Sequence, residues 1–216
     1  MQLKLYGYWR SSAVYRLRIA LNLKQLRYEY VPVSLKDGAQ HDAEFQARNP
    51  QALVPVLTHG ERTFRQSMSI IEYLDEAFEG RGYRLIPVEA RERARVRALS
   101  QVVACDIHPL NNLRVVGELE KRFGATQAQK DDWMRHWMAL GLDALEQLLA
   151  GNPSTGTFCE GDEPTMADCL LVPQVYNAQR FQLDLRPYPT IQRINAAALA
   201  LPEFDQARPE NQPDAS

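Results

Sequence analysis

Long hydrophobic runs are missing from this sequence of 216 residues. No stretch approaches the ~18 consecutive apolar residues of a membrane-spanning helix, and the chain passes from Leu5 to Arg10 without the apolar core of a signal peptide. A strong excess of one charge is missing too, because the formal net charge is -2. Such a chain has no basic field to attract nucleic acid. We therefore expect a cytoplasmic protein that binds neither membranes nor nucleic acid.

Cysteine and histidine are scarce. The three cysteines, Cys105, Cys159 and Cys169, are odd in number and far apart in the sequence. The four histidines form no pair at the spacing of metal ligands on one helical face. These counts argue against a disulfide framework and against a zinc site. We expect reduced thiols in the core and no bound metal.

The first part of the chain contains a regular alternation of strand and helix patterns. Strand patterns lie at 3–6, 28–33, 53–57 and 62–65. Helix patterns lie at 11–23, 44–48 and 67–78. The resulting order βαβαββα predicts an α/β domain. Pro55 cannot donate to a strand ladder, so we expect a strand start or an edge there, with a cis bond at Val54-Pro55.

Only helical patterns follow the Gly- and Pro-rich segment after the third helix. A long helix from Arg91 is expected to be kinked by Pro109, because an interior proline removes a helical hydrogen bond. The tail after Phe204 is rich in Pro, Asp and Gln and is expected to be an extended arm. These patterns predict a first domain at 1–80 and an all-helical domain at 88–216.

Two adjacent hydroxyls, Ser11 and Ser12, join the first strand to the first helix. A serine oxygen can accept from the free amides of a first helical turn, where the helix dipole also favours an anion. The pair therefore indicates either plain capping, with Ser12 as one candidate, or an anion site. Ser67 is likewise a favoured N-cap for its helix. Arg18 points away from the apolar stripe of the first helix and is expected to be solvated.

Short motifs over essentially the whole chain form a highly specific combination. They are Ser11-Ser12-Ala13 with Arg16-Leu17-Arg18-Ile19-Ala20-Leu21, Asn49-Pro50 with Val54-Pro55, Gln66-Ser67 with Ile70-Ile71-Glu72-Tyr73-Leu74, Cys105 to Asn112, Thr165-Met166-Ala167-Asp168, Val172-Pro173-Gln174 and Arg180-Phe181. On these motifs the chain resembles the zeta class of the glutathione transferases, which includes the maleylacetoacetate and maleylpyruvate isomerases. The resemblance implies a thioredoxin-like N-terminal domain, an all-α C-terminal domain, glutathione as cofactor and a homodimer.

The activity that the resemblance implies is glutathione-dependent cis-trans isomerisation of a small unsaturated dicarboxylate in aromatic catabolism. The thiolate adds to the cis double bond, the resulting single bond rotates, and elimination returns the trans isomer. Maleylacetoacetate and maleylpyruvate both fit, since both are acidic and they differ only beyond the keto group. A general glutathione S-transferase acting on electrophiles and a noncatalytic thioredoxin-fold binding protein are the alternatives.

The resemblance also implies roles for individual residues. Ser11 matches the hydroxyl that activates the glutathione sulfur, and Arg10 beside it is the second candidate catalytic residue. The residues implied around glutathione are Ser11, Ser12, Gln40, Val54, Pro55, Gln66, Ser67, His108, Asn112 and Arg114. The residues implied for the substrate carboxylates are Arg10, Arg114 and Arg180, because planar guanidinium groups suit carboxylates.

One departure from the family and two structural alternatives qualify these roles. Ala13 stands where many members have cysteine, which puts chemistry that depends on a protein thiol in doubt. Isomerisation is less affected, because its nucleophile is the glutathione thiolate. His108 could be an ordinary residue of a helix kink. Arg180 could instead form a salt bridge with Asp184.

Overall fold

The computed structural model describes residues 2–215, which divide into two compact units. The first unit holds the chain up to Ile86 together with the segment from Leu199 onward, and the second unit is Pro87–Ala198. The last residues therefore pack with the first unit, although they follow the second in sequence. The predicted domains at 1–80 and 88–216 are assignments of function, which this packing does not test, so they stay predictions.

The first unit is built on a four-stranded sheet in the order β2-β1-β3-β4. Its strands are β1 (Leu3–Gly7), β2 (Tyr28–Pro32), β3 (Val56–His59) and β4 (Arg62–Arg65). Strand β1 pairs parallel with β2 and antiparallel with β3, which pairs antiparallel with β4. Its first three helices are α1 (Ser12–Leu23), α2 (Ala43–Arg48) and α3 (Ser67–Ala77). The thioredoxin-like βαβαββα order is confirmed.

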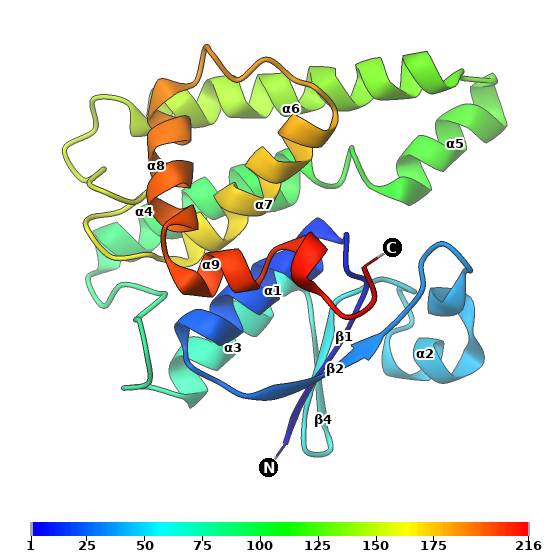
Figure 1. The fold of residues 1–216 in the computed structure, drawn as a ribbon, viewed down its shortest axis with the longest axis horizontal. Helices are drawn as coiled ribbons and strands as arrows, with labels where there is room; N and C mark the ends of the chain where they lie inside the picture. Colours follow the sequence, from blue (N-terminus) through cyan, green and yellow to red (C-terminus); the bar gives the residue numbers. More distant parts are fainter. Residues whose placement is uncertain (1, 216) are drawn as a thin grey trace. The chain divides into compact units, whose positions relative to one another are not determined.

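Helix α1 is the most buried element of this unit. Helices α1 and α3 lie side by side, with α2 on the other side of the strands (Figure 1). Every residue from Ala13 to Leu21 is buried. This includes Arg18, so the expectation that Arg18 is solvated was wrong. The side of α1 that carries Arg18 is covered by the C-terminal segment, to which its Nε donates at the Ala207 carbonyl oxygen (2.8 Å).

The third strand begins later than the sequence pattern predicts. The ladder starts at Val56, directly after Pro55, because proline has no N–H to give to a partner strand. The Val54-Pro55 peptide bond is cis, as expected. The strand shift leaves Leu53, Val54 and Pro55 as a loop beside the sheet, where the Asn49 side chain donates to the Leu53 carbonyl oxygen (2.7 Å).

A buried ion pair closes the first unit. Lys24, at the end of α1, donates from Nζ to Asp75 Oδ1 of α3 at 2.9 Å, and both side chains are almost inaccessible. Asp75 also accepts the backbone N–H groups of Leu85 and Ile86 at 2.9 and 3.0 Å. A single carboxylate therefore joins α1, α3 and the segment that leaves the unit. At the same place Gly82 has φ +53 and a Cβ there would lie 1.9 Å from the Leu23 carbonyl oxygen, so only glycine fits.

The second unit is all-helical. Its elements are α4 (Ala90–Gln101), the π-helix η2 (Val102–Ile107), α5 (Leu113–Phe123), α6 (Gln127–Leu149), α7 (Met166–Arg180) and α8 (Pro189–Leu199). Capping boxes open two of them, from Thr126 to Gln129 and from Thr165 to Asp168. Within residues 2–215, none of the helices has both the length and the apolar character that crossing a membrane requires.

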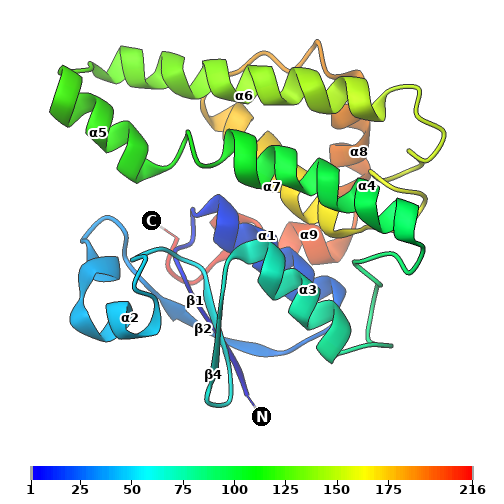
Figure 2. The ribbon, with the colours of Figure 1, turned by 180° about the vertical axis from the view of Figure 1, so that it is seen from behind.

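The expected kink at Pro109 is instead a break. Helix α4 changes to a π-helix at Val102, which ends at Ile107, and α5 begins only at Leu113 (Figure 2). The prediction of one long kinked helix was therefore wrong. Pro109 lacks the N–H that would continue the helical ladder. The preceding residue, His108, still has helical backbone (φ -58, ψ -40), and the chain turns after it.

The tail after Phe204 is not the extended arm that its composition predicts. It forms α9 (Pro202–Gln206) and a 3-10 turn, η3 (Pro209–Asn211), and it packs on α1. Phe204 is fully buried, and Asn22 of α1 donates to the Glu203 carbonyl oxygen at 2.9 Å. Burying one phenylalanine side chain contributes about 1.5–3 kcal/mol, and hydrogen bonds to Asn22, Arg18 and Trp9 also hold the tail on the first unit.

Candidate functional site

A tight turn delivers Ser11 to the start of α1. The Ser11 N–H donates to the Tyr8 carbonyl oxygen at 3.0 Å, so Trp9 and Arg10 form the middle of the turn. Ser11 is the N-cap, and its Oγ accepts from the Val14 N–H at 3.4 Å. Ser12 is the first helical residue, so the suggestion that Ser12 is the cap was wrong. The capping bond is long, and it leaves the Ser11 hydroxyl proton free to be donated to an anion.

The N-cap of α3 differs from the predicted one. The N-cap is Gln66, not Ser67, and its side chain makes no capping hydrogen bond. Ser67 is buried, and its Oγ accepts instead from Arg16 Nη1 at 3.2 Å. Arg16 belongs to α1, so it ties the helix that Ser11 caps to the helix that Ser67 begins. The first-turn amides of α3 are therefore left to an anionic ligand.

Gln66 also has unusual backbone. Its φ of 68° and ψ of 116° lie outside the regions that non-glycine residues favour. Holding such a residue costs about 1–3 kcal/mol and is typical of ligand-binding positions. The Gln66 side chain reaches back over the loop and donates to Gln51 Oε1 at 3.0 Å. Its position beside the uncapped amides of α3 suits recognition of a carboxylate and an amino group.

Gln40 and Val54 lie on two further loops of the first unit. Gln40 belongs to the 3-10 turn η1 (Ala39–His41), and its Oε1 is buried without accepting a hydrogen bond from any of residues 2–215. A buried acceptor with no partner is costly, so it marks a place where a ligand donor fits. Val54 precedes the cis bond and stands outside the sheet ladder.

Arg10 extends from the middle of the turn into solvent. Its guanidinium lies 5.2 Å from the centre of the Trp9 ring. No carboxylate among residues 2–215 forms an ion pair with it. A charged donor held by an aromatic ring and not neutralised by a neighbour is well suited to an anionic ligand.

The remaining candidates belong to the second unit. Asn112 is the N-cap of α5, and its Oδ1 accepts from the N–H of Arg114, whose side chain is exposed. His108 follows the π-helix, where its N–H donates to the Val103 carbonyl oxygen at 2.9 Å. Arg180 ends α7 with its guanidinium 5.0 Å from the Phe181 ring centre. Asp184, the alternative partner suggested for Arg180, is engaged by Arg186 at 2.7 to 3.0 Å.

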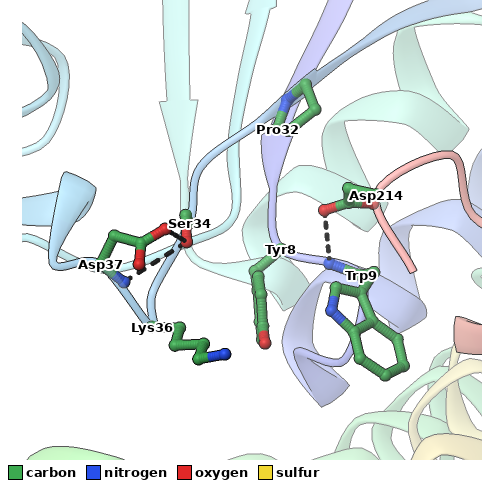
Figure 3. Close-up of a pocket in the computed structure, with 7 residues that line it drawn as sticks. All are labelled: Tyr8, Trp9, Pro32, Ser34, Lys36, Asp37 and Asp214. Carbon is green, nitrogen blue, oxygen red and sulfur yellow. Dashed lines mark hydrogen bonds between the residues drawn. The ribbon is translucent and has the colours of Figure 1, made fainter. Parts of the chain in front are cut away.

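A cavity of about 230 Å³ lies beside the turn and was not anticipated from the sequence. It is lined by Tyr8, Trp9, Pro32, Ser34, Lys36, Asp37 and Asp214. Figure 3 shows the Tyr8 ring between Lys36 and the Trp9 indole, and Asp214 of the tail above the turn. Lysine, tyrosine and indole groups around one hollow suit a small polar ligand.

Comparisons with known proteins give the family. Residues 5–82 match the family model described as glutathione S-transferase, N-terminal domain. A probable maleylacetoacetate isomerase of Vibrio cholerae is 52% identical over 217 residues, covering 100% of this chain and 99% of the relative. A holo structure of a maleylpyruvate isomerase, described as a bacterial glutathione S-transferase of the zeta class, is 48% identical with a TM-score of 0.96 and covers 99% of this chain and 100% of that one. The chain belongs to the zeta class of the glutathione S-transferases.

A third relative carries ligands. The maleylacetoacetate isomerase of Methylobacterium extorquens AM1, described with bound malonate and glutathione, is 42% identical with a TM-score of 0.94. The match covers 99% of both chains. The zeta-class motifs quoted from the sequence therefore identified the family correctly.

Three features of this zeta-class chain were not evident from its motifs. The positive φ of Gln66, the bond from Arg16 to Ser67 and the hydrogen bonds of Asp214 all depend on segments that meet only in the folded unit. A non-glycine residue with positive φ has no local sequence signature. Arg16 is buried among the apolar residues of α1.

Proposed function

We propose that the chain is a glutathione-dependent cis-trans isomerase of a maleyl keto-diacid, converting maleylacetoacetate or maleylpyruvate to the fumaryl isomer in aromatic catabolism. The observation that carries the proposal is that two helix N-termini suited to ligand binding are linked to each other. Ser11 offers a hydroxyl at the start of α1, and the uncapped start of α3 is joined to it through Arg16. The zeta-class relatives named as isomerases support the same activity.

The residues of the first unit fit glutathione. The uncapped α3 amides with Gln66 and Ser67 suit its γ-glutamyl end, and the backbone of Val54 suits its cysteinyl part. Ser12, next to Ser11, and Pro55, next to Val54, are proposed as further glutathione contacts. The remaining proposed contacts are Gln40, His108, Asn112 and Arg114. When bound, glutathione supplies the thiolate that adds reversibly to the substrate double bond. Ser11 donates a hydrogen bond to that sulfur, and the dipole of α1 favours its negative charge.

Arginine side chains are proposed to bind the two carboxylates of the substrate. Arg10 lies one residue before Ser11 and has no carboxylate partner within residues 2–215. We propose that Arg10, Arg114 and Arg180 hold the substrate carboxylates and stabilise the enolate that forms on addition. The malonate bound by the Methylobacterium extorquens relative is also a dicarboxylate.

The decisive experiment is a turnover assay with each maleyl diacid, with and without glutathione. The proposal expects isomerisation that requires glutathione and does not consume it. Consumption of glutathione by a range of electrophiles, without isomerisation, would indicate a general transferase. Glutathione binding without either reaction would indicate a noncatalytic binding protein. Comparing the two diacids at equal concentration decides which of them is preferred.

Alkylation of the free thiols is expected to leave turnover intact. Cys159 and Cys169 are buried, as expected, but Cys105 is exposed, so the expectation of a core thiol was wrong at that position. Burial raises the pKa of the Cys159 thiol well above its ordinary value, and Asp168 raises that pKa further, so little reactive thiolate forms there. Iodoacetamide should therefore modify Cys105 alone, as mass spectrometry would show. Cys105→Ser is the unlabelled control, and stoichiometric inactivation that glutathione prevents would mean that a protein thiol takes part after all.

Arg10→Leu is expected to raise the KM for the diacid by about 10- to 100-fold, since a hydrogen bond to a charged group contributes roughly 1.5–3 kcal/mol. The KM for glutathione should change much less, because Val54, Gln66 and Ser67, the proposed anchors of its cysteinyl and γ-glutamyl parts, lie on other segments. Arg62→Leu, at an exposed arginine of β4, is the matched control. Equal losses for the diacid and for a neutral electrophile would show that Arg10 supports the site without recognising charge.

We also propose that the protein is a cytoplasmic homodimer, as is common for this family. Sedimentation equilibrium should give twice the 24.7 kDa of one chain. A monomer that is fully active at micromolar concentration would contradict the proposal.

A further inference from the structure

Both peptide groups of Trp9 are held by charged side chains from other segments. The Trp9 N–H donates to Asp214 Oδ2 at 3.0 Å, as Figure 3 shows. The Trp9 carbonyl oxygen accepts from Arg18 Nη2 at 2.9 Å. Trp9 stands in the middle of the turn that leads to Ser11. The backbone of this turn is therefore fixed on one side by α1 and on the other by the C-terminal tail.

The two side chains are themselves anchored. Asp214 Oδ2 also accepts from the Tyr30 hydroxyl at 3.1 Å, and burial, reinforced by Asp214, raises the pKa of Tyr30 so that it stays a neutral donor. Arg18 is fully buried and donates from Nε to the Ala207 carbonyl oxygen of the same tail. The tail is held in shape by Gln212, whose Nε2 donates to the carbonyl oxygens of Gln206 and Arg208 at 3.0 and 2.7 Å. The turn and the tail thus form one hydrogen-bonded assembly.

A shift of Trp9 reaches Ser11 directly. Only Arg10 separates the two residues, and the turn is closed by the bond from the Ser11 N–H to the Tyr8 carbonyl oxygen. The capping bond of Ser11 is long, at 3.4 Å, so it gives the hydroxyl little independent support. A hydroxyl must stay within hydrogen-bond reach of its target to act on it, and a misplacement of about 1 Å can cost 100-fold in rate.

We propose that Asp214 is a positioning residue for Ser11, through which the C-terminal tail holds the turn that aims the Ser11 hydroxyl at the glutathione sulfur. This inference rests on the proposed role of Ser11. It assigns the C-terminal tail a part in the reaction, although Asp214 lies 205 residues after Trp9 in the sequence. Asp214 itself need not touch glutathione or the substrate.

The proposal predicts a specific division between binding and turnover. In Asp214→Ala the turn loses its carboxylate, while the proposed anchors of glutathione at Val54, Gln66 and Ser67 lie on other segments. Measured at a pH below the pKa of the bound thiol, the KM for glutathione should stay constant. The kcat should fall by about 10- to 100-fold, and the pKa of the bound glutathione thiol should rise. Asp214→Asn keeps a side-chain oxygen that can accept from the Trp9 N–H, so it should recover most of the turnover.

The experiment is a pH titration of the ultraviolet thiolate absorbance of bound glutathione, with kcat and KM measured alongside. Asp214→Ala, Asp214→Asn and a chain lacking residues 214–216 are compared with Asp205→Ala. Asp205 lies on the same tail, is exposed and pairs with Arg208, so its loss tests general disturbance of the tail. Only folded protein binds glutathione, so the thiol pKa is independent of any fraction that unfolds.

A raised thiol pKa in Asp214→Ala and in the shortened chain, with a normal pKa in Asp205→Ala, is the expected result. A lowered Tm with an unchanged thiol pKa and an unchanged kcat per bound glutathione would overturn the proposal and leave Asp214 a purely structural residue. Failure of the proposed function is distinguishable, because it would appear as absent isomerisation in the unaltered chain.

Discussion

Ser11→Ala is expected to lower turnover by about 10- to 1000-fold, because one donor to the reacting charge is removed. The hydroxyl proton that Ser11 would give to the glutathione sulfur has no replacement on Ala13. The pKa of the bound thiol should therefore rise toward its value in free glutathione, and the pH profile of kcat should move with it. Steady-state kinetics from acid to alkaline pH measures both effects.

Ser12→Ala is the matched control for this prediction. Ser12 is the first residue of α1, and the capping bond belongs to Ser11, so the Ser12 variant should lose much less activity. Loss of the N-cap also costs about 1 kcal/mol of stability, and thermal melts must show that Ser11→Ala is folded. Unchanged turnover and an unchanged thiol pKa in Ser11→Ala would refute the role of this residue.

Asp75→Ala is expected to lower the free energy of unfolding by about 3–5 kcal/mol, the usual cost of breaking a buried ion pair from one side. The change strands the Lys24 ammonium in a site that is almost closed to water. It also removes the acceptor of the Leu85 and Ile86 backbone N–H groups. Urea denaturation, followed by circular dichroism, gives the free energy directly.

Glu76→Ala supplies the comparison, because Glu76 is the exposed neighbour of Asp75 on α3. Its loss should change the free energy of unfolding by less than about 0.5 kcal/mol. A loss below about 1 kcal/mol in Asp75→Ala would show that the pair adds little beyond a surface ion pair. Turnover per folded molecule should be the same in both variants, since neither residue belongs to the proposed site.

Local patterns were sufficient to predict the order of elements in the first unit. Alternating apolar residues mark β1, a serine cap marks α1, periodic apolar residues mark α3, and Pro55 marks the start of β3. The wrong predictions concerned which other segments of the chain cover a helix. Arg18 looks solvated when α1 is considered alone, and it is buried because the segment that carries Ala207 returns from the end of the chain. No pattern within α1 contains that information.

The candidate site divides in the same way. The resemblance to the zeta class supplied the residue types, from Ser11 to Arg180, and their catalytic and binding roles stay predictions. The structure adds what motifs do not encode: Ser11 and not Ser12 is the N-cap of α1, and Gln66 and not Ser67 is the N-cap of α3. Two serines have the same capping preference, so the sequence could not decide between Ser11 and Ser12. At α3 the preference for serine as a cap predicted the wrong residue, because the Ser67 hydroxyl accepts from Arg16 instead.

The return of the chain to the first unit has a consequence for synthesis on the ribosome. The unit is interrupted after Ile86 and resumes at Leu199. At about 5–20 residues per second, translation of the intervening helices takes roughly 6–22 s. During that time the nascent chain has β1 to α3 but lacks Phe204, Ala207 and the carboxylate of Asp214. Arg18 must then remain hydrated on an α1 that the C-terminal segment does not yet cover, so the first unit to emerge is the last to finish folding.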